Sequence, residues 1–237
     1  MKQLISKIHQ ELKANIDTEY KKGEIMFFKE KIKVYGVRTP VVRKIAGKYF
    51  LLIKNLDKKK TFTLAESLLE SGYSEEATIA FDWVSRLEKQ YQKSDFKIFE
   101  SWLKKYISNW AECDDFCTHA FAEFILQFPE FLPKLNIWAR SKNRWLKRAS
   151  AVILIYPIKK GKQFLNKVFE ICNILLEDKD DLVQKGYGWL LKEASNLYQE
   201  RVFDYVMKNK SKMPRTALRY AIEKIPEEMR KKAKKRS

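Results

Sequence analysis

Apolar residues recur every three or four positions along most of the chain, as Leu4, Ile5, Ile8 and Leu12 do near its start. This spacing places them on one face of an α-helix. No apolar–polar alternation of the strand type competes with it, so the chain is expected to be all-α. The predicted helices cover 1–17, 18–34, 40–53, 61–71, 74–91, 94–107, 110–127, 129–141, 143–158, 161–177, 180–197, 199–209 and 213–224.

The helices carry an internal repeat. A small residue recurs at intervals of 36, 36, 37 and 31 residues, and an apolar or aromatic residue follows each of them three positions later. The small residues are Ala77, Cys113, Ala149, Gly186 and Ala217, and the residues that follow are Ala80, Phe116, Val152, Trp189 and Tyr220. A period in the thirties with two helical stretches per period is typical of a helical solenoid. Small residues at a fixed depth let neighbouring helices approach closely.

Each repeat also has a helix-start signal a few residues before its small residue. Asn, Asp, Ser and Thr side chains accept hydrogen bonds from the first turn, and proline lacks the N–H that would be orphaned there. The candidates are Ser74, Asn109, Asn143, Asp180 or Asp181, the pair Met213–Pro214 and, one step earlier, Thr39–Pro40. Gly36, just before that pair, is expected to stop the preceding helix in the left-handed conformation. The sequence therefore predicts a helical-repeat solenoid with a concave inner surface.

The charge is strongly positive, with 48 Lys and Arg against 30 Asp and Glu, a net charge of +18. Net charge speaks to partners, and this sign indicates a polyanion or an acidic membrane surface, with nucleic acid the leading idea. The concave surface is expected to be basic. The run from Arg230 to Arg236 is expected to be a solvated, frayed terminus. We therefore expect one repeat domain over residues 1–228 and a basic tail over 229–237.

Cysteine usage and hydropathy indicate the compartment. The chain has three cysteines, an odd number, and no recognisable secretory signal, which favours a reducing cytoplasm. No apolar run approaches the roughly 20 residues of a membrane span. The spacing of Cys113, Cys117 and His119 could suggest a metal site, but it fits helix packing better, and no metal is expected.

Unusual side chains gather near the starts of three successive second helices. Trp110 and Asp114 are four residues apart and share one helix face. Arg148 directly precedes the small residue of its repeat, and Trp189 follows its own by three. Taken singly, each has an ordinary explanation: a core tryptophan, an aspartate that compensates the helix dipole, or a solvated arginine. In one register they could converge, and the carboxylate would either serve a cationic ligand or pair with an arginine.

With these residues in place, the chain resembles the bacterial and archaeal DNA alkylation repair glycosylases built from HEAT-like repeats, the AlkD-like family. The resemblance spans about Gly23 to Ile225. The segments that carry it are Gly36–Arg43, Trp110–Asp114, Trp145–Ala149 and Gln184–Leu191.

The resemblance implies roles for individual residues. Asp114 matches the family's catalytic aspartate, Trp110 and Trp189 its two lesion-facing tryptophans, and Arg148 its phosphate-binding arginine. Phe27 stands where the family often has a tyrosine lining the site, so a hydroxyl is lost there. The other candidates for phosphate contact are Arg38, Arg43, Arg144, Lys147 and Lys185, together with Lys44 and Lys48.

The function implied is a monofunctional DNA glycosylase that releases N3- or N7-alkylated purines from duplex DNA in base excision repair. No cofactor, membrane or obligate protein partner is expected, and the protein is expected to be a monomer. Two alternatives stay open. One is a non-catalytic helical-repeat protein that binds duplex or branched DNA, and the other is a protein-binding scaffold.

Overall fold

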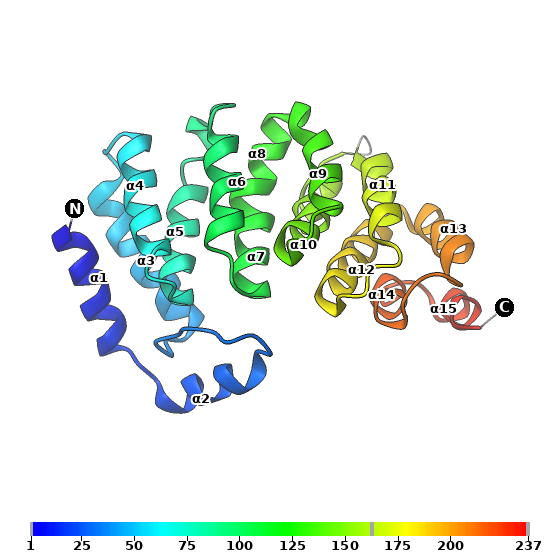
Figure 1. Cartoon of the computed structure of the whole chain (residues 1–237), viewed down its shortest axis with the longest axis horizontal. Helices are drawn as coiled ribbons and strands as arrows, with labels where there is room; N and C mark the ends of the chain where they lie inside the picture. Colours follow the sequence, from blue (N-terminus) through cyan, green and yellow to red (C-terminus); the bar gives the residue numbers. More distant parts are fainter. Residues whose placement is uncertain (1, 162–163, 236–237) are drawn as a thin grey trace. The chain divides into compact units, whose positions relative to one another are not determined.

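The computed structural model describes residues 2–161 and 164–235, and all regular secondary structure in those ranges is helical (Figure 1). The prediction of an all-α chain is therefore confirmed. The α-helices are α1 Lys2–Ala14, α2 Thr18–Phe27, α3 Thr39–Ile53, α4 Lys58–Leu69, α5 Ser74–Ser85, α6 Asp95–Lys105, α7 Trp110–Phe116, α8 Ala122–Gln127, α9 Leu132–Ala139, α10 Arg144–Val152, α11 Leu165–Leu175, α12 Asp181–Ser195, α13 Gln199–Asn209, α14 Arg215–Ala221 and α15 Glu227–Lys234. Short 3₁₀ turns and one π-helical turn, Cys117–Phe121, join some of them.

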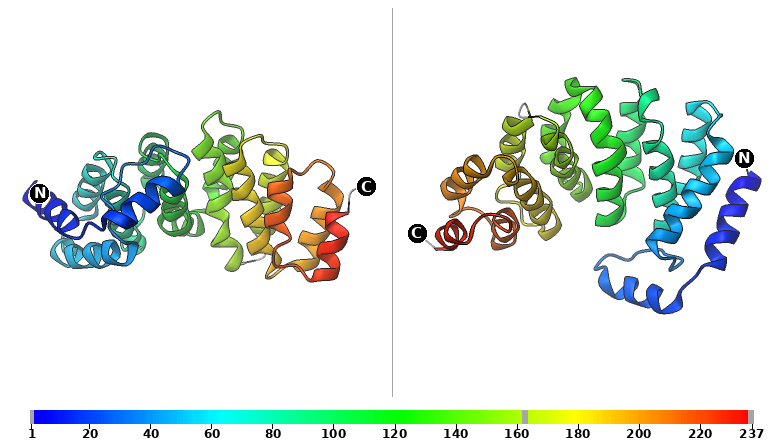
Figure 2. Two further views of the ribbon diagram at one scale, coloured as in Figure 1. Left: turned by 90° about the horizontal axis from the view of Figure 1, so that it is seen from below. Right: turned by 180° about the vertical axis from the view of Figure 1, so that it is seen from behind.

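The chain divides into two compact units, residues 1–120 and 121–237. Within the first unit, α5 packs against α3, α4 and α7. Within the second, α12 packs against α10 and α14 on either side and against α11 and α13 (Figures 1 and 2). In each unit the second helices of successive repeats thus lie side by side, as the repeat predicts.

The small residues of the repeat lie where these helices meet. All five are buried: Ala77, Cys113, Ala149, Gly186 and Ala217. A Cβ on Gly186 would lie 3.3 Å from Cγ of Arg148 on α10. Two residues further along α12, a Cβ on Gly188 would lie 2.9 Å from the Ala217 carbonyl oxygen on α14. The glycines therefore allow α12 to approach both neighbours at close range.

Gly188→Ala is expected to destabilise the protein. Its Cβ would lie 2.7 Å from Cβ of Tyr220 and close to backbone, so α14 must shift. Overpacking of this kind costs about 1–3 kcal/mol and outweighs the gain of up to about 1 kcal/mol in helix propensity. Gly186→Ala is the control, because its Cβ would meet only side-chain atoms of Arg148 and Val152, at 3.3 Å or more, and no backbone of a neighbouring helix. Urea unfolding followed by circular dichroism should show a lower midpoint for Gly188→Ala than for Gly186→Ala, and equal midpoints would contradict the close-packing argument.

Three of the predicted helix starts are confirmed as N-caps. The side chain of Asn109 accepts from the Glu112 N–H, that of Asn143 from the N–H groups of the first turn of α10, and that of Asp180 from the Leu182 N–H. At Thr39–Pro40 the helix starts where predicted, with proline in its first turn. Pro214 is itself the N-cap of α14.

Ser74 is not an N-cap. It is the first residue of α5, and Tyr73 occupies the cap position without a side-chain hydrogen bond. The Ser74 hydroxyl instead donates to the Glu112 carboxylate on α7, 2.7 Å away. A sequence signal for capping cannot distinguish these positions, because the same hydroxyl can serve its own helix or the next repeat.

The predicted helix over 18–34 is wrong beyond Phe27, where α2 ends. The N–H groups of Tyr35, Gly36 and Val37 donate to the buried carboxylate of Glu75, at 2.7–3.1 Å. These three hydrogen bonds hold the segment after Phe27 in an extended conformation, because in a helix the same N–H groups would point in other directions. Gly36 has a positive φ of 92°, as expected, but it lies in this segment and does not end a helix.

Gly36→Ala is expected to lower the free energy of unfolding by about 2–3 kcal/mol, because an L side chain is strained at this φ and its Cβ would overlap Lys21. Gly23→Ala on α2 is the control. Nothing lies within 4 Å of its Cβ position, and alanine favours the helix by about 0.5–1 kcal/mol. Thermal unfolding should therefore shift in opposite directions for the two variants. A neutral Gly36→Ala would show that this turn does not constrain the fold.

The prediction of a frayed basic tail is also wrong for the part that the structure describes. Residues Glu227–Lys234 form α15, which packs against α13, and Ala233 is buried. Lys210 reinforces the contact by donating to the carbonyl of Lys235 at 2.8 Å. Met229 and Ala233 are four residues apart and lie on the face of α15 that packs. This spacing is difficult to recognise in the sequence because charged residues surround both of them. Residues 236–237, at the end of the predicted tail, lie outside the described residues.

The remaining predicted boundaries differ from the structure mainly at helix ends. The stretch 143–158 is α-helical only to Val152 and continues in 3₁₀ turns. The helix predicted over 161–177 is α11, Leu165–Leu175, and positions 162–163 lie outside the described residues. No helix in the described parts of the chain is both long and apolar enough to cross a membrane.

Candidate active site

The start of α7 is fixed by a buried polar network in the first unit. Asn109 is fully buried and caps the helix, and Glu112 is 6% exposed. The Glu112 carboxylate accepts from the Ser108 N–H at 2.9 Å and from the hydroxyl of Ser74 on α5. Asn109 donates to the same hydroxyl at 3.2 Å. This first turn is therefore held by its own cap and by the preceding repeat.

That rigid turn carries Trp110 and Asp114, which lie one helical turn apart and are both partly exposed. The Asp114 carbonyl accepts the hydroxyl of Thr118 at 2.7 Å. The first unit thus presents an indole and a carboxylate on one face of α7, as the four-residue spacing predicts.

Two phenylalanines from the end of α2 pack on the indole. The ring of Phe28 is stacked on Trp110 with centroids 5.2 Å apart and an interplanar angle of 17°. Phe27 meets Trp110 edge-on at 6.0 Å and is 71% exposed. Phe28 is absent from the sequence-based list of site residues, although its place next to Phe27 was a usable signal. The result is a three-ring cluster beside the helix that carries Asp114.

Arg43 on α3 lies in a cluster of charges in the first unit. It contacts Asp115 at 2.5 Å and Asp82 at 3.7 Å, and these groups line a cavity of about 250 Å³. The ring of His119 also lies 3.2 Å from the Asp115 carboxylate, and this hydrogen bond raises the pKa of His119 despite desolvation. The arginine predicted to contact phosphate is thus held by protein carboxylates.

Arg38 is similarly occupied. Its guanidinium lies 2.9 Å from the Asp17 carboxylate and 5.1 Å from the centroid of the Tyr20 ring. The Tyr20 N–H and Arg38 together lower the pKa of Asp17. Lys48 lies 2.6 Å from Glu11. These cations are therefore all next to an acid in the structure.

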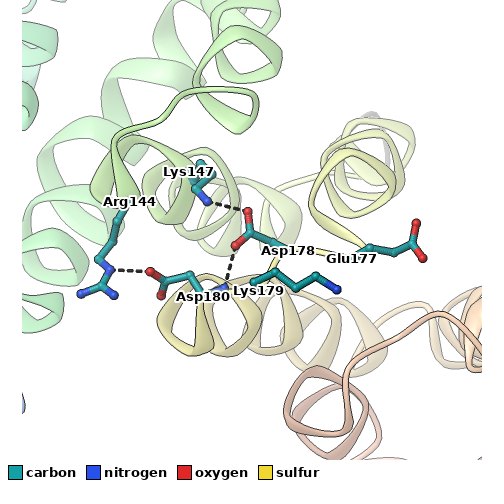
Figure 3. A pocket seen from close by; sticks show the side chains of 6 residues that line it. All are labelled: Arg144, Lys147, Glu177, Asp178, Lys179 and Asp180. Atoms are coloured by element: carbon teal, nitrogen blue, oxygen red, sulfur yellow. Dashed lines mark hydrogen bonds and ion pairs between the residues drawn. The ribbon is translucent and has the colours of Figure 1, made fainter.

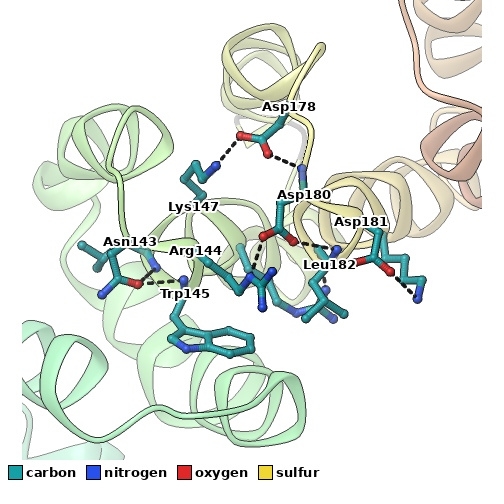
Figure 4. A network of polar contacts seen from close by, with 11 residues as sticks. Asn143, Arg144, Trp145, Lys147, Asp178, Asp180, Asp181 and Leu182 are labelled. Atoms are coloured by element: carbon teal, nitrogen blue, oxygen red, sulfur yellow. Dashed lines mark hydrogen bonds and ion pairs between the residues drawn. The ribbon is translucent and has the colours of Figure 1, made fainter. Parts of the chain in front are cut away.

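In the second unit, the cations predicted to contact phosphate are also paired with aspartates, and these pairs lie close together. Arg144 lies 2.5 Å from Asp180, Lys147 lies 2.6 Å from Asp178, and Lys185 lies 3.3 Å from Asp181 (Figure 4). Arg144 and Lys147 are on α10, whereas their acids lie in the turn before α12 and at its N-cap. These three of the cations predicted for phosphate contact are therefore paired with one short acidic segment.

Arg148 differs from these surface cations. It is 5% exposed and donates from Nη1 to the Leu182 carbonyl oxygen at 2.5 Å. Its side chain also lies against Gly186, so the guanidinium is held between α10 and α12. Trp189 lies on α12, three residues after Gly186, and is partly exposed. The resemblance assigns phosphate to Arg148, and its position also serves helix packing.

The candidate metal residues have other surroundings. Cys113 and Cys117 are buried in the packing of their helix, and His119 interacts with Asp115. Across the described residues, no group of three or more His, Cys, Asp or Glu side chains is placed to hold a metal ion.

Comparison with known proteins is informative at the level of the family and the fold. The model of the DNA alkylation repair enzyme family matches residues 8–225. The structure is similar to that of a predicted DNA alkylation repair enzyme from Enterococcus faecalis, with a TM-score of 0.79, 14% identity, and coverage of 90% of this chain and 98% of that one. A comparison with curated proteins finds no match.

A second solved structure, smu.31 from Streptococcus mutans UA159, is similar with a TM-score of 0.58 and 21% identity, covering 79% of this chain and 98% of the other. Both likenesses concern the fold, and they support the helical-repeat architecture. The family match spans most of the chain and includes every predicted site residue. The chain belongs to the DNA alkylation repair enzyme family, which implies a DNA substrate.

Proposed function

We propose that this protein is a DNA glycosylase that hydrolyses the N-glycosidic bond of N3- or N7-alkylated purines in duplex DNA. The observation that carries the proposal is the placement of Asp114 one turn from Trp110 on the pinned start of α7, in a chain of net charge +18 that belongs to a DNA alkylation repair family. A carboxylate beside a DNA-binding surface disfavours phosphate at that point, whereas it stabilises a positively charged ligand or transition state.

The chemistry of alkylated purines supplies that positive charge. Alkylation at N3 or N7 makes the base cationic and therefore a better leaving group. As the bond from C1′ to the base nitrogen breaks, the electron pair leaves with the base and positive charge develops on the sugar. The Asp114 carboxylate stabilises this charge and orients the water that adds to C1′. The proton lost by that water leaves with solvent, and the released base is neutral.

The aromatic cluster suits the same substrate. The faces of aromatic rings carry negative electrostatic potential and attract cations, with Trp the strongest. Trp110 is backed on one face by Phe28 and flanked by Phe27. In this proposal Trp110 and Trp189 contact the cationic base or the sugar, and the Phe27 ring adds apolar contact where the family often has a tyrosine. Because Phe27 lacks a hydroxyl, the cluster offers ring faces and no hydrogen bond at that position.

Phosphate binding falls to the arginines and lysines. Arg148, Arg144, Lys147 and Lys185 in the second unit, with Arg38 and Arg43 in the first, are the proposed contacts to the DNA backbone. Their guanidinium and ammonium groups form charge-assisted hydrogen bonds with phosphate oxygens. We further propose that the protein works as a monomer and needs no cofactor.

Asp114→Asn is expected to reduce base release by about 10²–10³-fold, the usual cost of removing one group that stabilises transition-state charge. The assay incubates the protein with methylated duplex DNA and measures 7-methylguanine and 3-methyladenine released in a single turnover. DNA affinity should not fall, because Asn keeps the size of the side chain and removes a negative charge.

Asp57→Asn is the matched control for that experiment. Asp57 caps α4 and is exposed, so the change also removes one negative charge while Asn preserves a cap. Base release by this variant should equal that of the wild type. If wild type binds the duplex and releases no base, the protein is a non-catalytic DNA-binding repeat protein and the glycosylase proposal fails.

Trp110→Leu is expected to slow base release by about 2- to 30-fold, the range spanned by cation–π interactions of about 0.5–2 kcal/mol. Trp110→Phe should recover part of the rate, since it keeps an aromatic face against Phe28. Single-turnover rates on duplex containing 7-methylguanine measure both variants, with urea midpoints to exclude unfolding. Equal rates for Leu and Phe would show that Trp110 contributes only apolar contact.

A further inference from the structure

The acidic segment Asp178–Asp181 accounts for every cation in the second unit that we assign to phosphate, apart from the buried Arg148. Its three aspartates, at 178, 180 and 181, pair with Lys147, Arg144 and Lys185 in turn. The first two pairs join α10 to the turn before α12, across adjacent repeats. The third lies within α12, four residues apart. Figure 4 shows the carboxylates of Asp178 and Asp180 directed at Lys147 and Arg144.

Two of these aspartates divide their oxygens between two tasks. One oxygen of Asp180 accepts the Leu182 N–H at 3.0 Å and caps α12, and the other faces Nε of Arg144. One oxygen of Asp178 accepts the Asp180 N–H at 2.9 Å, and the other faces Nζ of Lys147. Backbone N–H groups therefore fix each carboxylate, while its second oxygen occupies the position on the cation that a phosphate oxygen would take.

Two of the pairs, Arg144–Asp180 and Lys147–Asp178, also line a solvent-accessible cavity. A cavity of about 570 Å³ is bordered by Arg144, Lys147 and the 177–180 segment, which adds Lys179 (Figure 3). Arg144 is 44% exposed at its side chain, whereas Lys147 is 19% exposed. The cations are thus reachable from the surface, with their first hydrogen-bonding partners already supplied by the chain itself.

We propose that this acidic segment is an internal substitute for DNA phosphates, which are exchanged for it one for one when Arg144 and Lys147 bind the backbone. The inference rests on the proposed binding of duplex DNA. The carboxylate oxygens hold the cations in a pre-arranged position before binding. They also reduce affinity for undamaged DNA, because each phosphate contact must first break an ion pair.

The exchange predicts a particular salt dependence. A cation that neutralises a phosphate releases condensed counterions, which lowers log K with log salt by about 0.9 per contact. When the cation is exchanged from its carboxylate to a phosphate, the freed carboxylate attracts cations from solution, so fewer counterions are released in total and the slope is smaller. Removing the carboxylate charge should therefore both tighten binding and steepen the slope.

The test uses Asp178→Asn and Asp180→Asn. Asn keeps an oxygen that accepts the Asp180 or Leu182 N–H, and it caps helices as well as Asp does, so the fold should be retained. Affinity for a short fluorescein-labelled undamaged duplex, measured by anisotropy between about 50 and 200 mM salt, should rise about two- to five-fold per variant, as expected for loss of a partly exposed ion pair. The slope should steepen by up to about 0.9.

Asp57→Asn is again the matched control, because Asp57 also caps a helix and pairs with a lysine, Lys60, that is not assigned to phosphate. It should leave affinity and slope unchanged. A second test combines Asp180→Asn with Arg144→Gln. If the carboxylate acts by occupying Arg144, the gain from Asp180→Asn disappears in the Arg144→Gln background.

Two results would overturn the inference. The first is that the Asp178 and Asp180 variants bind the undamaged duplex no more tightly than Asp57→Asn, or more weakly than wild type. The ion pairs then only connect neighbouring repeats, and no exchange occurs. The same holds if the gain persists without Arg144. Base release from methylated DNA, measured alongside, separates this failure from failure of the glycosylase proposal, since the exchange concerns binding to undamaged duplex alone.

Discussion

Close approach between the second helices of successive repeats is the constraint on which the other features depend. On α12 it is met by Gly186 facing α10 and by Gly188 facing α14, where a Cβ would contact side chain or backbone. Protein interiors are packed as densely as organic crystals. Because these glycines have no side chain, α12 lies so close to its neighbours that there is little room for the helices to shift. This spacing leaves Arg148 buried between α10 and α12 and Trp189 partly exposed on α12. Packing therefore determines where the chemical groups can be.

Buried carboxylates add a second kind of constraint to this basic protein. Glu75 accepts three backbone N–H groups from the segment after α2, and Glu112 joins the start of α7 to α5. A buried charge is costly unless hydrogen bonds satisfy it, and both glutamates have several. The first fixes the segment that follows Phe27 and Phe28, and the second fixes Trp110 and Asp114. The candidate site of the first unit is thus supported from both sides by structural acids.

The surface acids have a different relation to the cations. Arg38, Arg43, Arg144, Lys147 and Lys185 each contact an aspartate in the structure. These pairs are partly exposed, so breaking one costs less than breaking a fully buried ion pair. The same pairs keep the long side chains ordered for the backbone they are proposed to bind.

The sequence by itself determined the all-α class, the repeat and its register, because helical periodicity and small residues at fixed depth are local properties of the chain. It also placed Trp110 and Asp114 on one face, since four residues make about one turn. Only the tertiary structure decided that α2 ends at Phe27, that Ser74 serves Glu112, that α15 packs on α13, and that Phe28 stacks on Trp110. Each of these depends on a partner some 20 to 80 residues away in the chain. Local propensity carries no information about such partners, whereas a buried carboxylate or an aromatic face can override it.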